Sequence, residues 1–432
     1  MSRSHAPAPP LHLAPAQTKV HTSLPQSQSA LVLLCFFEAA ERFAATALGS
    51  VLVLHLTERH GASNGDALRL VGLFQGLCYA LPIVGGTLSD RLGRHDIGLR
   101  LGALFLVVGY AALGVAKPAA LMPLLVLLAN GHALFKPNIA ALLSQLCVAD
   151  EQRSGRAFAW FYVAANAGGL LGPLCSGLLL RYVGWPSVCA LAASSLAFCM
   201  LLTPPRSGPR QSGDLLSKAT HRPHDSSPTA IPCVRRIKDV ALVLCTLMAA
   251  GGGLAQLDGA ILLWVRDGIQ RQILGMEAPV AWFAALPALL VLLVSPLLSR
   301  WDRRAPNHSQ VARLPRKIFL GLLCMSLAFV AFALLSLPLA SVQRVHMAWL
   351  LTAYPLLALG ELRVIPALQS RLASRLPTTQ AGLAGGLFFA SLAAGQWLSG
   401  LIGPLWTCIA PSSYFGIWAM LLAAVACLWR RF

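Results

Sequence analysis

Twelve long apolar stretches constrain the fold of this chain more than any other feature of its sequence. A helix that crosses a bilayer needs about 20 mostly apolar residues, and only 12% of these 432 residues are charged. A soluble domain has about 25% charged residues. The stretches run approximately over residues 30–56, 69–89, 97–116, 120–146, 155–180, 185–203, 237–265, 280–300, 316–337, 345–370, 380–403 and 411–429. We therefore predict an all-α membrane protein with twelve transmembrane helices.

Lysine and arginine are distributed unevenly between the loops. With an even number of spans both termini lie on one side, and 24 of the 34 Lys and Arg fall on that side, against seven on the other. Cytoplasmic loops of membrane proteins carry such an excess. We therefore expect a multi-pass protein of the cell (inner) membrane with both termini in the cytoplasm. The net charge of +18 then reflects this orientation and contact with anionic lipid, and no nucleic-acid partner is expected.

Two polar, proline-rich segments flank or divide the apolar stretches. Residues 1–29 are rich in Pro, Ser, Ala and Gln, a composition typical of a disordered tail. Residues 204–236 separate the first six stretches from the last six, as a linker between two bundles does. We expect two six-helix bundles, over residues 30–203 and 237–432.

The sequence carries no signature of an enzyme or of a metal site. Its eleven cysteines fall mostly inside the apolar stretches without a CxxC pair, which favours a packing role. No HExxH motif, nucleophile elbow or Cys/His ligand set occurs. We expect neither catalysis nor a cofactor or metal.

Ionisable residues of both signs lie inside several apolar stretches. A charge at the bilayer centre costs roughly 2.5–3.5 kcal/mol on insertion scales, so such residues need partners or a water-filled cavity. This pattern predicts a site that handles protons or a charged substrate inside the membrane. The residues are Glu38, Glu41 and Arg42 in the first stretch, Lys136 in the fourth, Asp258 in the seventh, and Glu361 and Arg363 in the tenth.

The charges of the first stretch share one helix face. Glu38, Glu41 and Arg42 stand at positions i, i+3 and i+4, which are neighbours on a helix. A low-dielectric cavity favours the neutral form of a carboxylate, and an adjacent cation favours the charged form. A carboxylate whose proton affinity depends on a movable cation is what proton coupling requires. The alternative is a purely structural ion pair of Glu38 with Arg42.

The loop after the second stretch resembles a motif of the major facilitator superfamily, G-x-L-x-D-R-x-G-R. A carboxylate beside a helix end can bond a neighbouring helix N-terminus and arginine, and so stabilise one conformation at the cytoplasmic surface. We call this segment the conformational latch; the alternative is an ordinary basic loop. Its matching residues are Gly86, Asp90, Arg91, Gly93 and Arg94.

Four further segments resemble the signatures of the proton-coupled oligopeptide transporter (POT/PTR) family, and the resemblance extends over residues 30–430. Phe37–Phe43 matches E-x-x-E-R-F, and Asn130–Ile139 resembles G-x-x-x-K-P-N, with one residue more between Gly131 and Lys136. Phe161–Gly168 is similar to F-Y-x-x-I-N-x-G, and Gly360–Pro366 to G-E-L-x-x-S-P. Together they imply the major facilitator fold, with two six-helix bundles around a central cavity.

The resemblance implies inward symport of protons with a small peptide or related zwitterion by alternating access. It assigns proton coupling to Glu38, Glu41, Arg42, Lys136 and Glu361. The substrate would contact Arg42, Lys136 and Glu361 through its charged ends, and Tyr162, Asn166, Gln256 and Asp258 through other groups. Partners are thus the small solute, protons and the bilayer.

The sequence also departs from the family. Ala44, Ala45, Thr46 and Ala47 stand where a tyrosine pair and glycine are usual. The family's F-E-Q segment keeps only its glutamine, Gln256, and Asp258, two residues on, is interpreted as a replacement for the lost glutamate. His132 is interpreted as a packing group. Two alternatives therefore stay open: a proton-driven transporter of a non-peptide solute, including drug-like efflux, and a non-transporting membrane sensor.

Overall fold

A computed structural model describes residues 24–146, 151–202, 233–273, 275–303, 314–337, 344–376 and 381–430. Most of the predicted tail (1–29) and linker (204–236) lies outside these residues. The parts that are described are helical, because the first helix begins at Leu24 and the first helix after the linker begins at Cys233.

All of the first six apolar stretches form helices. Pro82 has no amide hydrogen and begins a new helix, so the second span is broken into two segments. The elements are α1 (Leu24–Glu58), α2 (Asn64–Ala80), α3 (Pro82–Leu92), α4 (His95–Gly114), the 3₁₀ turn η1 (Pro118–Ala120), α5 (Leu121–Leu146), α6 (Glu151–Tyr182) and α7 (Trp185–Leu201).

The last six stretches are helical too, and the seventh is interrupted by a 3₁₀ turn at Gln256–Asp258. The elements are α9 (Cys233–Ala255), η2 (Gln256–Asp258), α10 (Ala260–Gly268), η3 (Val280–Ala285), α11 (Leu286–Arg303), α12 (Leu314–Leu335), η6 (Met347–Trp349), α13 (Leu350–Arg375), α14 (Ala381–Ile402), η8 (Gly403–Thr407) and α15 (Pro411–Trp429). All twelve predicted stretches are therefore helical.

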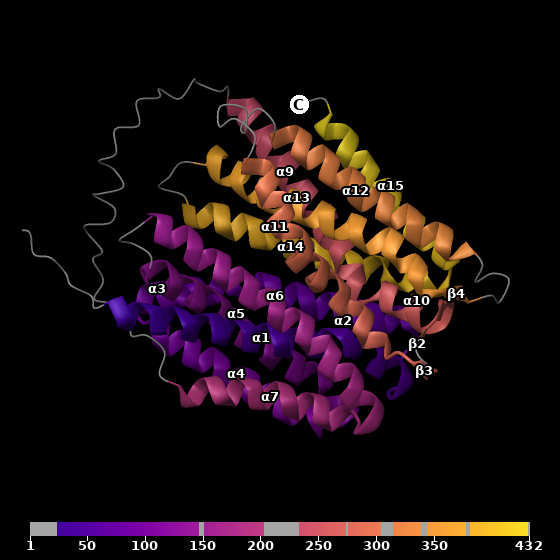
Figure 1. Cartoon of the computed structure of the whole chain (residues 1–432), viewed down its shortest axis with the longest axis horizontal. Helices are drawn as coiled ribbons and strands as arrows, with labels where there is room; N and C mark the ends of the chain where they lie inside the picture. Colours follow the sequence, from indigo (N-terminus) through magenta and orange to yellow (C-terminus); the bar gives the residue numbers. More distant parts are fainter. Residues whose placement is uncertain are drawn as a thin grey trace, which may run out of the picture.

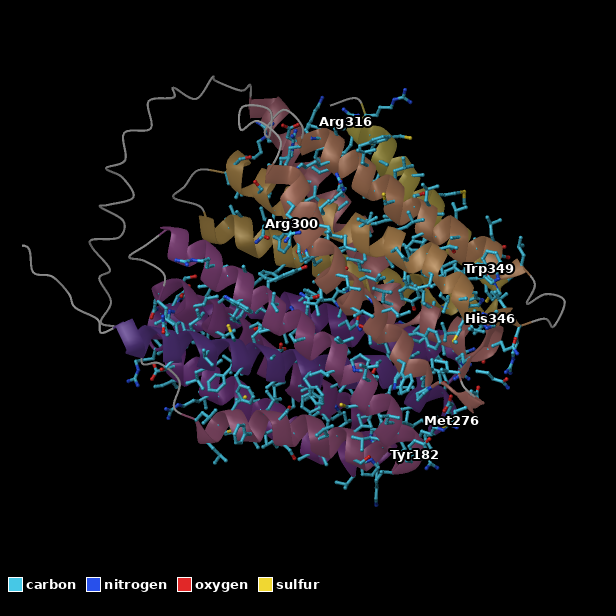
Figure 2. All side chains as sticks on the ribbon, in the orientation of Figure 1. Tyr182, Met276, Arg300, Arg316, His346 and Trp349 are labelled. Atoms are coloured by element: carbon cyan, nitrogen blue, oxygen red, sulfur yellow. The ribbon has the colours of Figure 1, made fainter. Side chains whose placement is uncertain are left out.

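The only strands among the described residues are two-residue pairs. β1 (Ile269–Gln270) runs parallel to β4 (Val345–His346), and β2 (Gln272–Ile273) runs antiparallel to β3 (Met276–Glu277). They lie at the end of the molecule opposite the chain termini (Figure 1). Figure 2 places Met276, His346, Trp349 and Tyr182 toward this end, and Arg300 and Arg316 away from it.

The helices form two groups, α1–α7 and α9–α15, that lie on either side of the molecule (Figure 1). Ten helical segments are long and apolar enough to cross a membrane. α7 is also apolar but has 17 residues, and the 35-residue α1 carries the charges described above. The all-α fold with its transmembrane helices is as predicted.

The two groups contact each other closely in the half of the molecule away from the termini. α2 packs on α14 through small residues, so that a Cβ atom on Gly72 would lie 2.6 Å from Cα of Gly400. In the same half, Arg266 of α10 donates from Nη1 to Thr57 Oγ1 of α1 at 2.9 Å and from Nη2 to Asn64 Oδ1 of α2 at 3.4 Å. This end of the interface is therefore closed by backbone contact and by hydrogen bonds.

Glycines also allow α1 to lie against α6 within the first group. A Cβ atom on Gly168 would collide with the carbonyl oxygen of Ala39, and one on Gly172 would collide with the Thr46 hydroxyl. Small residues four apart let membrane helices approach this closely, and van der Waals packing then stabilises the pair.

The substitution Gly168→Ala is expected to destabilise the protein, because overpacking costs about 1–3 kcal/mol. Gly416→Ala is the matched control, since a Cβ atom on Gly416 of α15 would meet no atom within 4 Å. Thermal unfolding in detergent should show a lower Tm for Gly168→Ala and an unchanged or higher Tm for the control. Equal Tm values would contradict the packing described here.

Candidate functional site

A cavity of about 200 Å³ lies between the two groups of helices. Its charged lining is divided between them. The cations Arg42 and Lys136 come from α1 and α5, and the carboxylates Asp258 and Glu361 come from η2 and α13. The four ionisable residues come from widely separated stretches of sequence, and all were predicted to belong to one site.

Glu41 is the most enclosed charged group of the site, with no exposed surface. Three basic groups surround its carboxylate. His132 Nδ1 lies 2.6 Å from Oε1, Lys136 Nζ lies 3.5 Å from Oε1, and Arg42 Nε lies 4.0 Å from Oε2. His132 and Lys136 stand four residues apart on α5, so one helix face presents both to α1. A buried carboxylate requires such partners because desolvation otherwise disfavours its charge.

Arg42 connects the two glutamates of α1. Its Nε donates to Glu38 Oε1 at 3.3 Å, and Glu38 is only 6% exposed. The Glu38–Arg42 ion pair that was weighed as a structural alternative is therefore present. Because Arg42 also lines the cavity, the same cation is available to a ligand.

The two cavity carboxylates of the second group, Asp258 and Glu361, differ from Glu41 in their surroundings. Among the described residues, no Lys or Arg nitrogen lies within the 4.0 Å ion-pair distance of Asp258 or Glu361. Asp258 Oδ2 accepts a hydrogen bond from Gln75 Nε2 of α2 at 3.0 Å, which joins the two helix groups. The cavity therefore holds two carboxylates that no Lys or Arg in the described part of the chain pairs with directly.

Three of the residues predicted to contact substrate, Tyr162, Asn166 and Gln256, do not line the cavity. Tyr162 is 44% exposed, and its backbone carbonyl accepts a hydrogen bond from Asn166 Nδ2 at 2.9 Å. Its side chain lies within electrostatic range of Glu361 and Arg42. Tyr162 and Asn166 therefore stand beside the charged groups without enclosing the cavity.

Gln256 was predicted to contact substrate, and the structure places it elsewhere. Its Nε2 donates to Ser399 Oγ at 2.7 Å, and its Oε1 accepts from the Tyr414 hydroxyl at 3.1 Å. These bonds hold η2 against α14 and α15. Because the Gln256 side chain points into the second helix group, its amide forms its hydrogen bonds there rather than in the cavity.

The predicted conformational latch gathers at the end of α3. Gly93 ends the helix with φ 65°, a conformation that favours glycine, and Gly86 lies against Pro137 of α5. Asp90 is close to His95, whose Nε2 is 3.7 Å from Oδ1, and Arg94 instead pairs with Asp96 at 3.2 Å. Arg91 is exposed. In this structure the described latch residues bond only within the first helix group.

Sequence reasoning missed several residues that line the cavity. His132 was interpreted as a packing group, yet it binds Glu41. Tyr79 lies under Lys136, with Nζ 5.8 Å from the ring centroid. Gln75 and Tyr79 are four apart on α2, a spacing that could have indicated a shared polar face. Nothing in the sequence singles out Tyr110 of α4 or Gln396 of α14, which also line the cavity.

The positions that depart from the family signature divide between cavity and core. Ala45 and Thr46 line the cavity, whereas Ala44 is fully buried. With a volume of about 200 Å³, the cavity is smaller than the 300–1,000 Å³ typical of sites for drug-sized ligands. The loss of the tyrosine pair has not produced a large cavity in this structure.

The chain is similar to known proteins over most of its length. Residues 34–404 match the sequence profile of the Major Facilitator Superfamily. A dipeptide and tripeptide permease B of Edwardsiella piscicida is 23% identical over 421 residues, covering 86% of this chain and 85% of that protein. A dipeptide and tripeptide permease A of Cronobacter turicensis is 24% identical over 442 residues, covering 90% and 87%. The resemblance drawn from the motifs is confirmed.

Solved structures of peptide transporters share the fold. A peptide transporter POT in complex with sulfate superposes with a TM-score of 0.80 at 21% identity, covering 93% of this chain and 94% of the other. A POT family transporter in complex with 5-aminolevulinic acid superposes with a TM-score of 0.76 at 18% identity, covering 93% and 95%.

Replacing Glu41 by alanine should destabilise the protein by about 3–5 kcal/mol, the usual cost of removing one partner from a buried ion pair. Lys136 and Arg42 would lose their shared carboxylate. Thermal unfolding in detergent tests this, with Glu58→Ala on the exposed end of the same helix as control. The double variant Glu41→Ala/Lys136→Ala should recover part of the loss. A Tm for Glu41→Ala equal to that of Glu58→Ala would contradict the assignment.

Proposed function

The chain belongs to the major facilitator superfamily, and from this membership we propose that it is a proton-coupled symporter. It imports small peptides or related zwitterionic solutes by alternating access, in which two helix bundles rock about a central site. The peptide permeases and POT structures to which it is similar support the substrate class.

The observation that carries this proposal is the division of charge across the cavity. The cations Arg42 and Lys136 belong to one helix group, and the carboxylate Glu361 belongs to the other. A ligand with a carboxylate and an ammonium can engage both groups at once. Binding then favours the closed arrangement over the open ones, and a ligand shifts a conformational equilibrium only through such differential contacts.

The roles follow from the distances. In the ligand-free site, Arg42 pairs with Glu38 and Lys136 pairs with Glu41. When a ligand binds, both cations form ion pairs with its carboxylate instead. Glu361 receives the ligand ammonium. Protons then compensate the carboxylates that have lost a cation, so that proton and ligand binding are linked reciprocally. Tyr162 and Asn166 contact the ligand from the open side, and Asp258 contributes through its bond with Gln75.

A zwitterion other than a peptide is the second candidate. Two observations favour it: the aromatic pair of the family is replaced by Ala45 and Thr46, and the cavity is about 200 Å³ in volume. Both reduce the surface available to grip a peptide backbone. The charge division across the cavity serves either ligand.

The orientation and boundaries complete the proposal. Both termini are in the cytoplasm, the two bundles comprise residues 30–203 and 237–432, and the segment between them is a cytoplasmic linker. The contacts that close the end away from the termini then close the external side, which makes this an inward-facing arrangement. The conformational latch at Asp90 would form its contacts with the second bundle in the outward-facing one.

Uptake of dialanine into proteoliposomes should depend on an inward proton gradient. A protonophore is expected to abolish accumulation, because the cavity carboxylates need protons to compensate their charge during the cycle. Radiolabelled uptake with and without the protonophore measures this. Accumulation that persists without a proton gradient and follows a sodium gradient would contradict proton coupling.

The substitution Lys136→Ala should abolish concentrative uptake, because Glu41 loses the cation that responds to the ligand. The protein should still fold, since protonation of Glu41 can offset part of the cost of breaking the pair. Accumulation is expected to fall about tenfold or more, as for loss of a proton-transfer group. Lys117→Ala, at an exposed position, is the control. Wild-type accumulation by Lys136→Ala would rule out this role.

A further inference from the structure

We propose that His132 and Glu41 form the proton-uptake pair of this transporter, in which the imidazole passes a proton between the cavity and the buried carboxylate. The inference rests on the proposed proton-coupled function and names the groups that receive the proton. His132 is not among the residues to which the family resemblance assigns proton coupling.

The geometry places the imidazole between Glu41 and the cavity. His132 is 2% exposed and Glu41 is fully buried, and Nδ1 lies 2.6 Å from Glu41 Oε1. Glu41 itself does not line the cavity, whereas His132 does. Because Nδ1 is engaged by the carboxylate, Nε2 is the ring nitrogen left to exchange a proton with the cavity.

Charge counting shows when the proton is needed. In the ligand-free site, Glu38 and Glu41 are matched by Arg42 and Lys136, so this cluster is neutral with a neutral histidine. A ligand carboxylate that takes over the two cations leaves the cluster with one uncompensated negative charge. Glu41 keeps only His132 as its close partner. One proton restores neutrality, and it reaches the Glu41 carboxylate through His132.

The transfer can be written without any further reactant. A neutral imidazole donates its Nδ1–H to the Glu41 carboxylate, and its Nε2 lone pair accepts a proton from a hydronium ion that reaches the cavity from the solvent and is left as water. The Nδ1 proton then moves to Glu41 Oε1. The products are a neutral imidazole protonated at Nε2 and a neutral carboxylic acid. Positioned proton transfer of this kind requires hydrogen-bond distance, which the pair has.

The surroundings of His132 contain few other groups that could take this role. α1 contributes Glu38 and Arg42 besides Glu41, and α5 contributes Lys136. Cys78 and Tyr79 of α2 and Tyr110 of α4 line the same cavity, and the carboxylates Asp258 and Glu361 lie on its other wall. Of these residues, only His132 both contacts Glu41 within 3 Å and lines the cavity.

The test compares proton uptake on ligand binding between wild type and His132→Gln, with dialanine as the probe. Glutamine keeps an N–H donor for Glu41 but cannot carry a proton. Because the proton ends on Glu41, isothermal titration in buffers of different ionisation enthalpy should give about one proton per bound dialanine for wild type and close to none for Glu41→Gln. Stopped-flow mixing with dialanine and a pH dye should show that His132→Gln takes up this proton about a hundredfold more slowly, because the positioned relay group is lost. The ratio of gradient-driven accumulation to exchange should fall about tenfold. His346→Gln, on the far surface, is the control and should resemble wild type.

A second measurement needs neither a ligand nor a transport assay. Infrared difference spectra between two pH values, on protein with ring-¹⁵N histidine, should show an imidazole band that is absent in His132→Gln and shifts in Glu41→Gln. If His132→Gln does not fold, the shift between wild type and Glu41→Gln decides alone.

The outcomes separate this inference from the proposed function. Proton-driven accumulation in wild type with an undiminished rate of proton uptake in His132→Gln would overturn the inference and leave the symporter intact. Wild type that neither binds nor accumulates dialanine would count against the peptide substrate. The infrared bands would then still decide the pair, and a histidine band indifferent to Glu41→Gln would overturn it.

Discussion

The structure depends on the compensation of one buried carboxylate. Glu41 has no exposed surface, and an uncompensated charge in such a place costs several kcal/mol. His132, Lys136 and Arg42 provide that compensation from two helices. In the proposed function, the cations that neutralise Glu41 are also the ones that bind the ligand. The charge balance that keeps α1 and α5 packed is therefore linked to ligand binding. The same constraint explains why α1 tolerates three charges within an apolar helix.

The second constraint is the distribution of charge between the two helix groups. The first group holds a balanced cluster, while the second brings Asp258 and Glu361 to the cavity without cationic partners among the described residues. A cavity with only a structural role would not require cations on one wall and unpaired carboxylates on the other. A ligand or proton that completes the balance acts on both groups together, and it does so next to the interface that Gly72, Gly400 and Arg266 close. In the proposed mechanism, binding of a ligand or proton in the cavity is therefore coupled to the rocking of the two bundles.

The site was partly readable before the fold was known. The i, i+3, i+4 spacing placed Glu38, Glu41 and Arg42 on one face, and the short signatures brought Lys136 and Glu361 to them. The directions in which the Gln256 and His132 side chains point could not be predicted, for the same physical reason. Whether a polar side chain in a span faces the cavity or its own bundle depends on helix rotation, and a few degrees of rotation are set by packing against neighbours. The Gln256 amide is hydrogen-bonded to Ser399 and Tyr414, and the His132 imidazole is hydrogen-bonded to Glu41.

The sequence by itself determined that the chain crosses a membrane twelve times as helices, because lipid offers no partners to backbone groups and leaves few other solutions. It also determined which spans carry charge, since each such residue is costly and therefore conspicuous. Only the tertiary structure decided which charges meet. The 2.6 Å distance between His132 and Glu41 depends on how their helices pack against neighbours, such as Gly168 against α1 and Gly85 against α5. Those contacts depend on the shapes of both surfaces, and no local pattern encodes them.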